Sequence, residues 1–145
     1  MVAAHVALAT SRYHAADLIQ ASGLLPVGIT VGSARWLRYE LAATVGMLAP
    51  FGDVNGVPLR RIEDEAVFEV AYRARLERFG VGAIGAVLAA LVAAYGARGA
   101  VLLCFEDVHT GESCHRRTFA RWWEEQTGVV VSELEPAQRP LPLEL

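Results

Sequence analysis

The chain has 145 residues, a hydrophobic fraction of 54% and a formal net charge of −3. This length predicts one domain that buries a core without cross-links, and the net charge argues against binding nucleic acid through bulk electrostatics. The most apolar stretch, Val81–Ala97, is shorter than a typical membrane span and suits a buried helix better. The N-terminus lacks a cationic start before its apolar segment, so we expect no signal peptide and a cytoplasmic protein whose two cysteines form no disulfide.

The first half of the chain begins with a strand over residues 5–11 and a short helix over 12–23, closed by Gly23. Residues 24–33 are apolar, β-branched and glycine-rich, which predicts a second strand. Residues 35–53 fit either a short helix or a loop that crosses one face of the fold. The Asn-Gly and Pro of residues 51–58 predict a turn.

The second half is more regular. Apolar residues at helical spacing predict a helix over residues 63–79, and the alanine-rich residues 81–97 predict another. The continuous apolar run in 99–107 is typical of a central strand buried on both faces. A helix over 114–128 and a strand over 129–134 follow.

This alternation of strands and helices predicts an α/β fold: a compact, single-domain, three-layer structure with a mostly parallel sheet. We place the domain at residues 5–135 and a Pro-rich C-terminal tail at 136–145. In such folds ligands bind beyond the carboxyl ends of the strands.

The stretch AVLLCFEDVHTGESCHRR, residues 100–117, lies at such a strand end. It holds both cysteines, two of the four histidines and two adjacent arginines of the chain. Three kinds of site compete for it: a metal site, a reactive thiol and an anion pocket.

A metal site would draw on Cys104, His109, Cys114 and His115. Their spacing differs from that of the usual zinc knuckles. Adjacent residues at a helix start diverge by about 100°, which makes shared ligation by Cys114 and His115 awkward. We therefore expect no metal and no cofactor, although zinc binding stays open as a minor alternative.

A reactive thiol would be Cys114, near a predicted helix N-terminus that Ser113 caps. The helix terminus and the cations at His115, Arg116 and Arg117 lower a thiol pKa. The alternative is a structural cysteine that packs beneath the helix start.

An anion pocket would use the same helix N-terminus together with the forked donors of Arg116 and Arg117. These arginines could instead pair with Glu106, Asp107 or Glu112. Glu106 shares a strand face with Cys104 and is the better candidate for acid/base catalysis, whereas Asp107 is expected to cap or pair.

The segment LLCFEDVHTGESCHRRTFARWWEEQTG resembles the signature of the domain-of-unknown-function 488 family, in which a strand ending in cysteine and an acidic residue precedes a Cys-His-Arg helix start. VGITVGSARW and YELAATVGMLAP also resemble the N-terminal half of one subgroup. The resemblance covers about residues 5–135. It implies a compact bacterial α/β domain of unassigned activity, with conserved positions at Cys104, Glu106, Cys114, His115 and Arg116.

The N-terminal half supplies further candidates at the same sheet edge. Arg12 follows the first strand, and Arg35, Arg38 and Tyr39 follow the second. Arg35 and Arg38 share one face if their segment is helical. Trp36 and Tyr39 could stack on a base, or simply pack in the core.

The sequence thus predicts an enzyme-like pocket for a nucleotide or nucleic-acid-derived anionic ligand. Its expected catalytic residues are Glu106, His115 and Cys114, and its expected ligand-binding residues are Arg116, Arg35, Arg12 and Tyr39. The alternative function is a non-catalytic interaction domain that forms a homodimer or binds a partner through 81–97 or through the Trp122–Trp123 helix.

Overall fold

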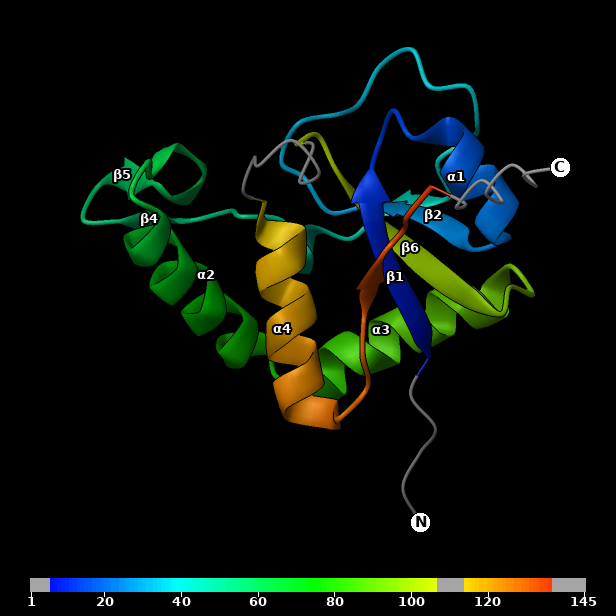
Figure 1. Cartoon of the computed structure of the whole chain (residues 1–145). Helices are drawn as coiled ribbons and strands as arrows, with labels where there is room; N and C mark the ends of the chain where they lie inside the picture. The colour runs from blue at the N-terminus through cyan, green and yellow to red at the C-terminus, as the bar shows by residue number, and fades with distance from the viewer. Residues whose placement is uncertain (1–5, 107–113, 137–145) are drawn as a thin grey trace, which may run out of the picture.

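The computed structural model describes residues 6–106 and 114–136. Five strands form one sheet in the order β3-β2-β6-β1-β7, and every strand pair in it is parallel. The strands are β1 (Ala7–Arg12), β2 (Leu25–Gly28), β3 (Ala43–Thr44), β6 (Gly99–Cys104) and β7 (Ser132–Glu133). The α-helices are α1 (Ala16–Ser22), α2 (Glu65–Phe79), α3 (Val81–Ala94) and α4 (His115–Thr127) (Figure 1).

The central strand is β6, as its apolar run predicts. All six of its residues are buried. It pairs with β1 from Gly99 to Cys104 and with β2 from Ala100 to Leu103. The carboxyl ends of β1, β2 and β6 therefore meet at one edge of the sheet.

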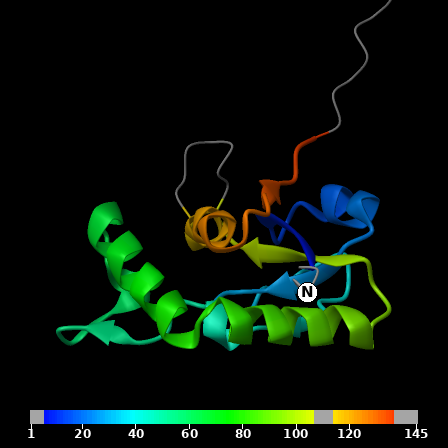
Figure 2. The same cartoon turned by 90° about the horizontal axis from the view of Figure 1, so that it is seen from below.

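Two hydrophobic clusters cover the two faces of the sheet, which confirms the α/β fold. On one face, Leu102 packs with Ile84 of α3, Leu76 of α2 and Trp123 of α4. On the other face, Val101 and Leu103 pack with Ile19 of α1 and with residues 34–41. Figure 2 shows α1 and α3 on opposite sides of the sheet.

Local sequence signals explain where the helices begin and end. Asp64 caps α2 by accepting from the backbone N–H groups of Ala66 and Val67. Gly23 and Gly128 end α1 and α4 in the left-handed conformation, with φ of 66° and 76°.

Residues 35–53 form no α-helix. They run as a loop across one face and contain β3 and the 3₁₀ turn Gly46–Leu48. Arg35 and Arg38 consequently do not share a helical face. The predicted turn at 51–58 is a hairpin of β4 (Asp53–Val54) and β5 (Val57–Pro58), whose Asn55 and Gly56 have φ of 50° and 84°.

Within the described residues, no helix taken alone has the length and apolar character needed to cross a membrane. Only α2 and α3 counted together reach that length, across a bend of 76°.

Two glycines allow a matched test of the packing. A Cβ at Gly99 would lie 2.4 Å from the backbone oxygen of Ala7, whereas a Cβ at Gly82 on α3 meets nothing within 4 Å. We expect Gly99→Ala to lower the free energy of unfolding by about 1–3 kcal/mol, because β1 and β6 must separate. Gly82→Ala should raise it by about 0.5 kcal/mol. Urea unfolding followed by the fluorescence of the buried Trp122 and Trp123 measures both, and equal effects would contradict the close approach of β1 and β6.

Candidate metal centre

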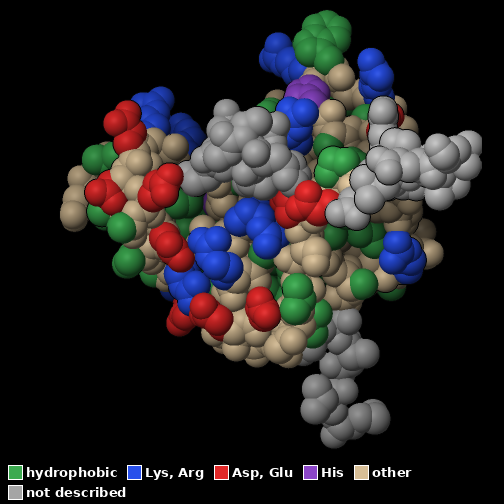
Figure 3. Space-filling model, in the orientation of Figure 1, with side chains coloured by type: hydrophobic (Ala, Val, Ile, Leu, Met, Phe, Trp, Pro, Cys, Tyr) green, Lys and Arg blue, Asp and Glu red, His purple; other side chains and the backbone are tan. Residues whose placement is uncertain are grey.

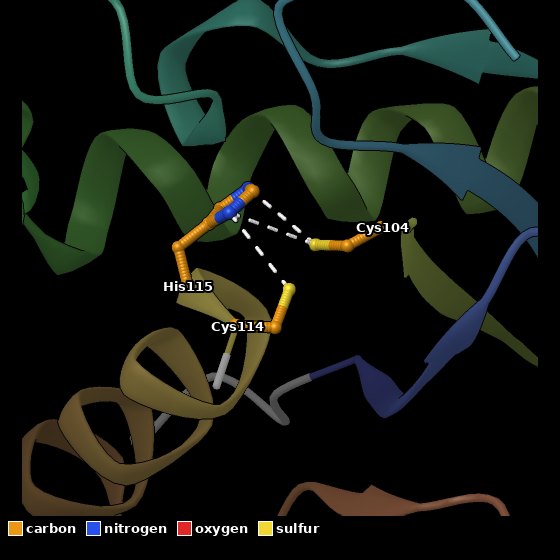
Figure 4. Close-up of side chains that lie close together, drawn as sticks. All are labelled: Cys104, Cys114 and His115. Carbon is orange, nitrogen blue, oxygen red and sulfur yellow. Dashed lines mark hydrogen bonds between the residues drawn. The ribbon is translucent and has the colours of Figure 1, made fainter. Parts of the chain in front are cut away.

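Three soft donor atoms converge where β6 ends and α4 begins. Cys104 is the last residue of β6, Cys114 precedes α4, and His115 is the first residue of α4. His115 Nδ1 lies 3.7 Å from Cys104 Sγ and 3.9 Å from Cys114 Sγ, and Nε2 lies 3.5 Å from Cys104 Sγ. One ligand atom from each residue fits within 4.8 Å of the others, and Figure 4 shows the three side chains pointing toward one another.

The backbone of Cys114 makes this convergence possible. Cys114 occupies the N-cap position with φ −148° and ψ 142°, so it is extended rather than helical. The expectation that Cys114 and His115 diverge by about 100° assumes two helical residues. Cys114 is not helical, because it occupies the N-cap position that the sequence predicts for Ser113. Ser113 itself lies outside the described residues.

The spacing of the donor atoms matches tetrahedral coordination. Bond lengths of about 2.3 Å for Zn–S and 2.0 Å for Zn–N place a sulfur and a nitrogen ligand about 3.5 Å apart in a tetrahedron. The distances of 3.7 and 3.9 Å between His115 Nδ1 and the two sulfurs are close to this value.

A backbone contact fixes the orientation of the imidazole. His115 Nε2 lies 2.6 Å from the carbonyl oxygen of Ile29, which can only accept a hydrogen bond. Nε2 therefore carries a proton, and Nδ1 is the ring nitrogen left to act as a metal ligand. In metal sites, the histidine ring nitrogen that does not bind the ion commonly donates to a carbonyl or carboxylate oxygen in this way.

The electrostatics of the site favour one thiolate in the pair. Burial raises the pKa of Cys114, but hydrogen bonds with Cys104 and His115 and the charges of His115 and Arg116 outweigh it and lower the pKa to about 3. Burial and the neighbouring Cys114 raise the pKa of Cys104. The thiolate is the form that binds metals and attacks electrophiles.

Arg116 links the segments that surround the site. Its side chain is fully buried, and Nε and Nη2 each donate to the Glu133 carboxylate at 2.9 Å. Nη1 donates to the backbone oxygen of Glu106 at 2.8 Å. One guanidinium thus joins α4, β7 and the end of β6, and it presents no free face to a ligand.

Glu106 lies on the open side of the cluster. Its Oε2 is buried without a hydrogen-bond partner among the described residues. Burial, followed by the charge and hydrogen bond of Cys114, raises the pKa of its carboxyl group. Glu106, Cys114 and His115 all line a pocket of about 530 Å³, a size usual for small-molecule sites.

The remaining predicted residues lie elsewhere. Arg12 lines a second groove of about 530 Å³ at the other side of the same sheet edge, and Arg35 is exposed in the 31–42 loop. Tyr39 donates its hydroxyl to the backbone oxygen of Tyr13 at 2.5 Å, and burial raises its pKa to about 12. Asp107, His109 and Glu112 fall outside the described residues.

Sequence reasoning missed two partners in the site. Glu133 pairs with Arg116, and the Ile29 carbonyl orients His115 from 86 residues away. A glutamate in a short strand carries no local signal of such a role. Arg117, weighed as an anion ligand, donates to Thr10 Oγ1 at 2.8 Å and to the Val131 oxygen at 3.0 Å, and it also lines the 530 Å³ pocket.

The Arg116–Glu133 pair can be compared with a surface pair that joins α2 and α4. The side chains of Arg116 and Glu133 are 0% and 9% exposed, whereas those of Arg73 and Glu125 are 27% and 55% exposed. We expect Glu133→Ala to lower the free energy of unfolding by about 3 kcal/mol, because it leaves a buried charge unpaired. Glu125→Ala should cost less than about 1 kcal/mol. Chemical unfolding of both variants provides the measurement, and similar costs would show that Arg116 does not depend on Glu133.

The chain matches no protein-family model, no curated protein and no solved structure. Its resemblance to the domain-of-unknown-function 488 family therefore stays a prediction.

Proposed function

We propose that the protein binds one zinc ion through Cys104, Cys114 and His115 and is a zinc-dependent hydrolase. The observation that supports this most is the arrangement of the three donor atoms. Nδ1 of His115 lies 3.7 and 3.9 Å from the two sulfurs, close to the nitrogen–sulfur spacing of a tetrahedral site, while Nε2 is engaged by the carbonyl of Ile29. Two thiolates and one imidazole form a soft ligand set that suits zinc.

The number of protein ligands supports a catalytic rather than a structural site. Structural zinc ions usually have four protein ligands, whereas catalytic ones have three and keep a position for water or substrate. The described residues supply three. Two of them, Cys114 and His115, also line the pocket, so the fourth position would face it. A zinc ion there would lower the pKa of a bound water and polarise the bond to be cleaved.

Glu106 is the proposed proton acceptor. Its Oε2 is buried without a partner among the described residues and belongs to a side chain that lines the pocket beside Cys114. A carboxylate in that place can take a proton from the attacking water and pass it to the leaving group. His115 is in this proposal a ligand rather than an acid or base.

The pocket wall suggests the class of substrate. Arg60, Arg117 and Arg121 line it and can contact phosphate oxygens through forked donors. The wall also carries Glu63, Glu65 and Glu69, and Glu69 lies 3.6 Å from Arg121. The pocket wall therefore carries both positive and negative side chains. From the arginines and the volume of the pocket, we propose a phosphate ester of about nucleotide size as the substrate.

The first experiment measures metal content. Elemental analysis of protein purified without chelator should give about one zinc per chain, and Co²⁺ substitution should give the visible bands of a tetrahedral thiolate site. Cys104→Ala, Cys114→Ala and His115→Ala should each lower the metal affinity at least about tenfold, because each removes a ligand. His14→Ala, which changes an exposed histidine outside the cluster, is the matched control.

The main competing outcome is a dithiol redox pair. In that case the protein would contain no metal, and oxidised glutathione would convert Cys104 and Cys114 into a disulfide. That result would overturn the zinc proposal. Circular dichroism of the three ligand variants separates loss of metal from loss of fold.

The role of Glu106 gives a second test. With bis(p-nitrophenyl) phosphate as the probe, Glu106→Gln should keep the zinc content and lower kcat by about 10²–10⁴-fold, as removal of a general base does. Glu63→Gln, on the same pocket wall, should change kcat much less. Unchanged kcat in Glu106→Gln would exclude Glu106 as the base.

A further inference from the structure

A second surface at the same sheet edge carries an unusual tryptophan. Trp36 is 91% exposed, although tryptophan is among the side chains that gain most from burial. Its φ is 62°, a left-handed conformation that is a genuine outlier for a bulky residue. Neither burial nor backbone preference explains the presence of tryptophan at this position. Residues with a strained backbone of this kind cluster at binding sites.

The loop around Trp36 is firmly attached to the protein. Leu37, Tyr39 and Leu41 pack against the cluster that contains Tyr13, and the Tyr39 hydroxyl donates to the Tyr13 backbone. The exposed indole is therefore carried by an anchored segment. A ring held in this way binds a planar ligand with little loss of conformational freedom.

Cationic side chains surround the indole. Arg12, His14, Trp36 and Arg38 line the second groove, and Arg35 is the exposed neighbour of Trp36. In Figure 3, arginine and histidine side chains gather beside an exposed hydrophobic side chain at the top of the molecule, where Figure 1 shows the cyan loop. The carboxylates of the groove are Asp17 and Glu133, and Glu133 is already paired with Arg116.

We propose that this surface binds single-stranded nucleic acid, with one base stacked on Trp36 and the flanking phosphates held by Arg35 and Arg38. Aromatic platforms beside a cationic groove are how proteins bind single strands without reading their sequence. The local cluster supplies the attraction that the net charge of −3 does not.

The surroundings of Trp36 favour this ligand over a protein or a membrane. Protein interfaces and membrane-binding surfaces present contiguous apolar patches. Trp36 is the only large hydrophobic side chain of the 31–42 loop that is exposed, and arginines stand on both sides of it. A single aromatic ring among cations matches a base and its phosphates better.

The test uses a fluorescein-labelled single-stranded oligonucleotide and the full chain. Anisotropy titrations at low salt should show binding that weakens as salt rises. Trp36→Ala should weaken it by about tenfold, whereas Trp36→Phe keeps a stacking ring and should bind nearly as well. Arg35→Ala and Arg38→Ala should each reduce the slope of log Kd against log salt by about one. Arg78→Ala, an exposed arginine at the end of α2, is the charge-matched control.

One further variant separates binding from folding. Glycine tolerates a φ of 62°, so Trp36→Gly should unfold at a temperature no lower than the wild type while binding the oligonucleotide as poorly as Trp36→Ala. No binding by the wild type at low salt, or equal binding by Trp36→Ala, would overturn the proposal. The Cys104→Ala variant should bind the oligonucleotide normally, so this result and the zinc result can fail independently.

Discussion

The fold depends on one buried strand. β6 pairs in parallel with β1 on one side and β2 on the other, and none of its residues reaches solvent. Because its register with both neighbours is fixed, the residues that follow β1 and β2 lie at defined places around Cys104. Tyr13 donates its backbone N–H to the Cys104 oxygen, and Ile29 donates its own to the Leu103 oxygen. The carbonyl of Ile29 that orients His115 is therefore held by the strand that carries Cys104.

The candidate centre joins this rigid edge to the start of α4. The Arg116–Glu133 pair ties the helix start to the edge strand, and His115 ties it to the end of β2. Removing a guanidinium from water is unfavourable, and the attraction to Glu133 offsets this only because the contact is bidentate. Such a pair contributes to the positioning of side chains more than to stability, and the proposed zinc site would depend on such positioning.

Much of the fold follows from local sequence signals, whereas the site follows from contacts between distant residues. The apolar run of β6 and the glycines at 23 and 128 predict elements that the structure has. The cluster of Cys104, Cys114 and His115 depends on Cys114 lying one residue before α4 and on the contact between His115 and Ile29. Neither fact has a local signal. For residues 35–53 the sequence left a helix and a loop open for the same reason, since Leu37 and Tyr39 are fixed by contacts with the core and not by their neighbours in sequence.

The two outer strands have a consequence for how the protein behaves in a crowded solution. β3 and β7 contain two residues each, and β3 and β7 are the edges of the sheet. An open edge of that length offers few free backbone groups to a strand from another molecule. The longer apolar strands, which would be effective templates for aggregation, stay between them. The shortest strands of the sheet therefore shield the longer apolar strands from edge-to-edge pairing with another molecule.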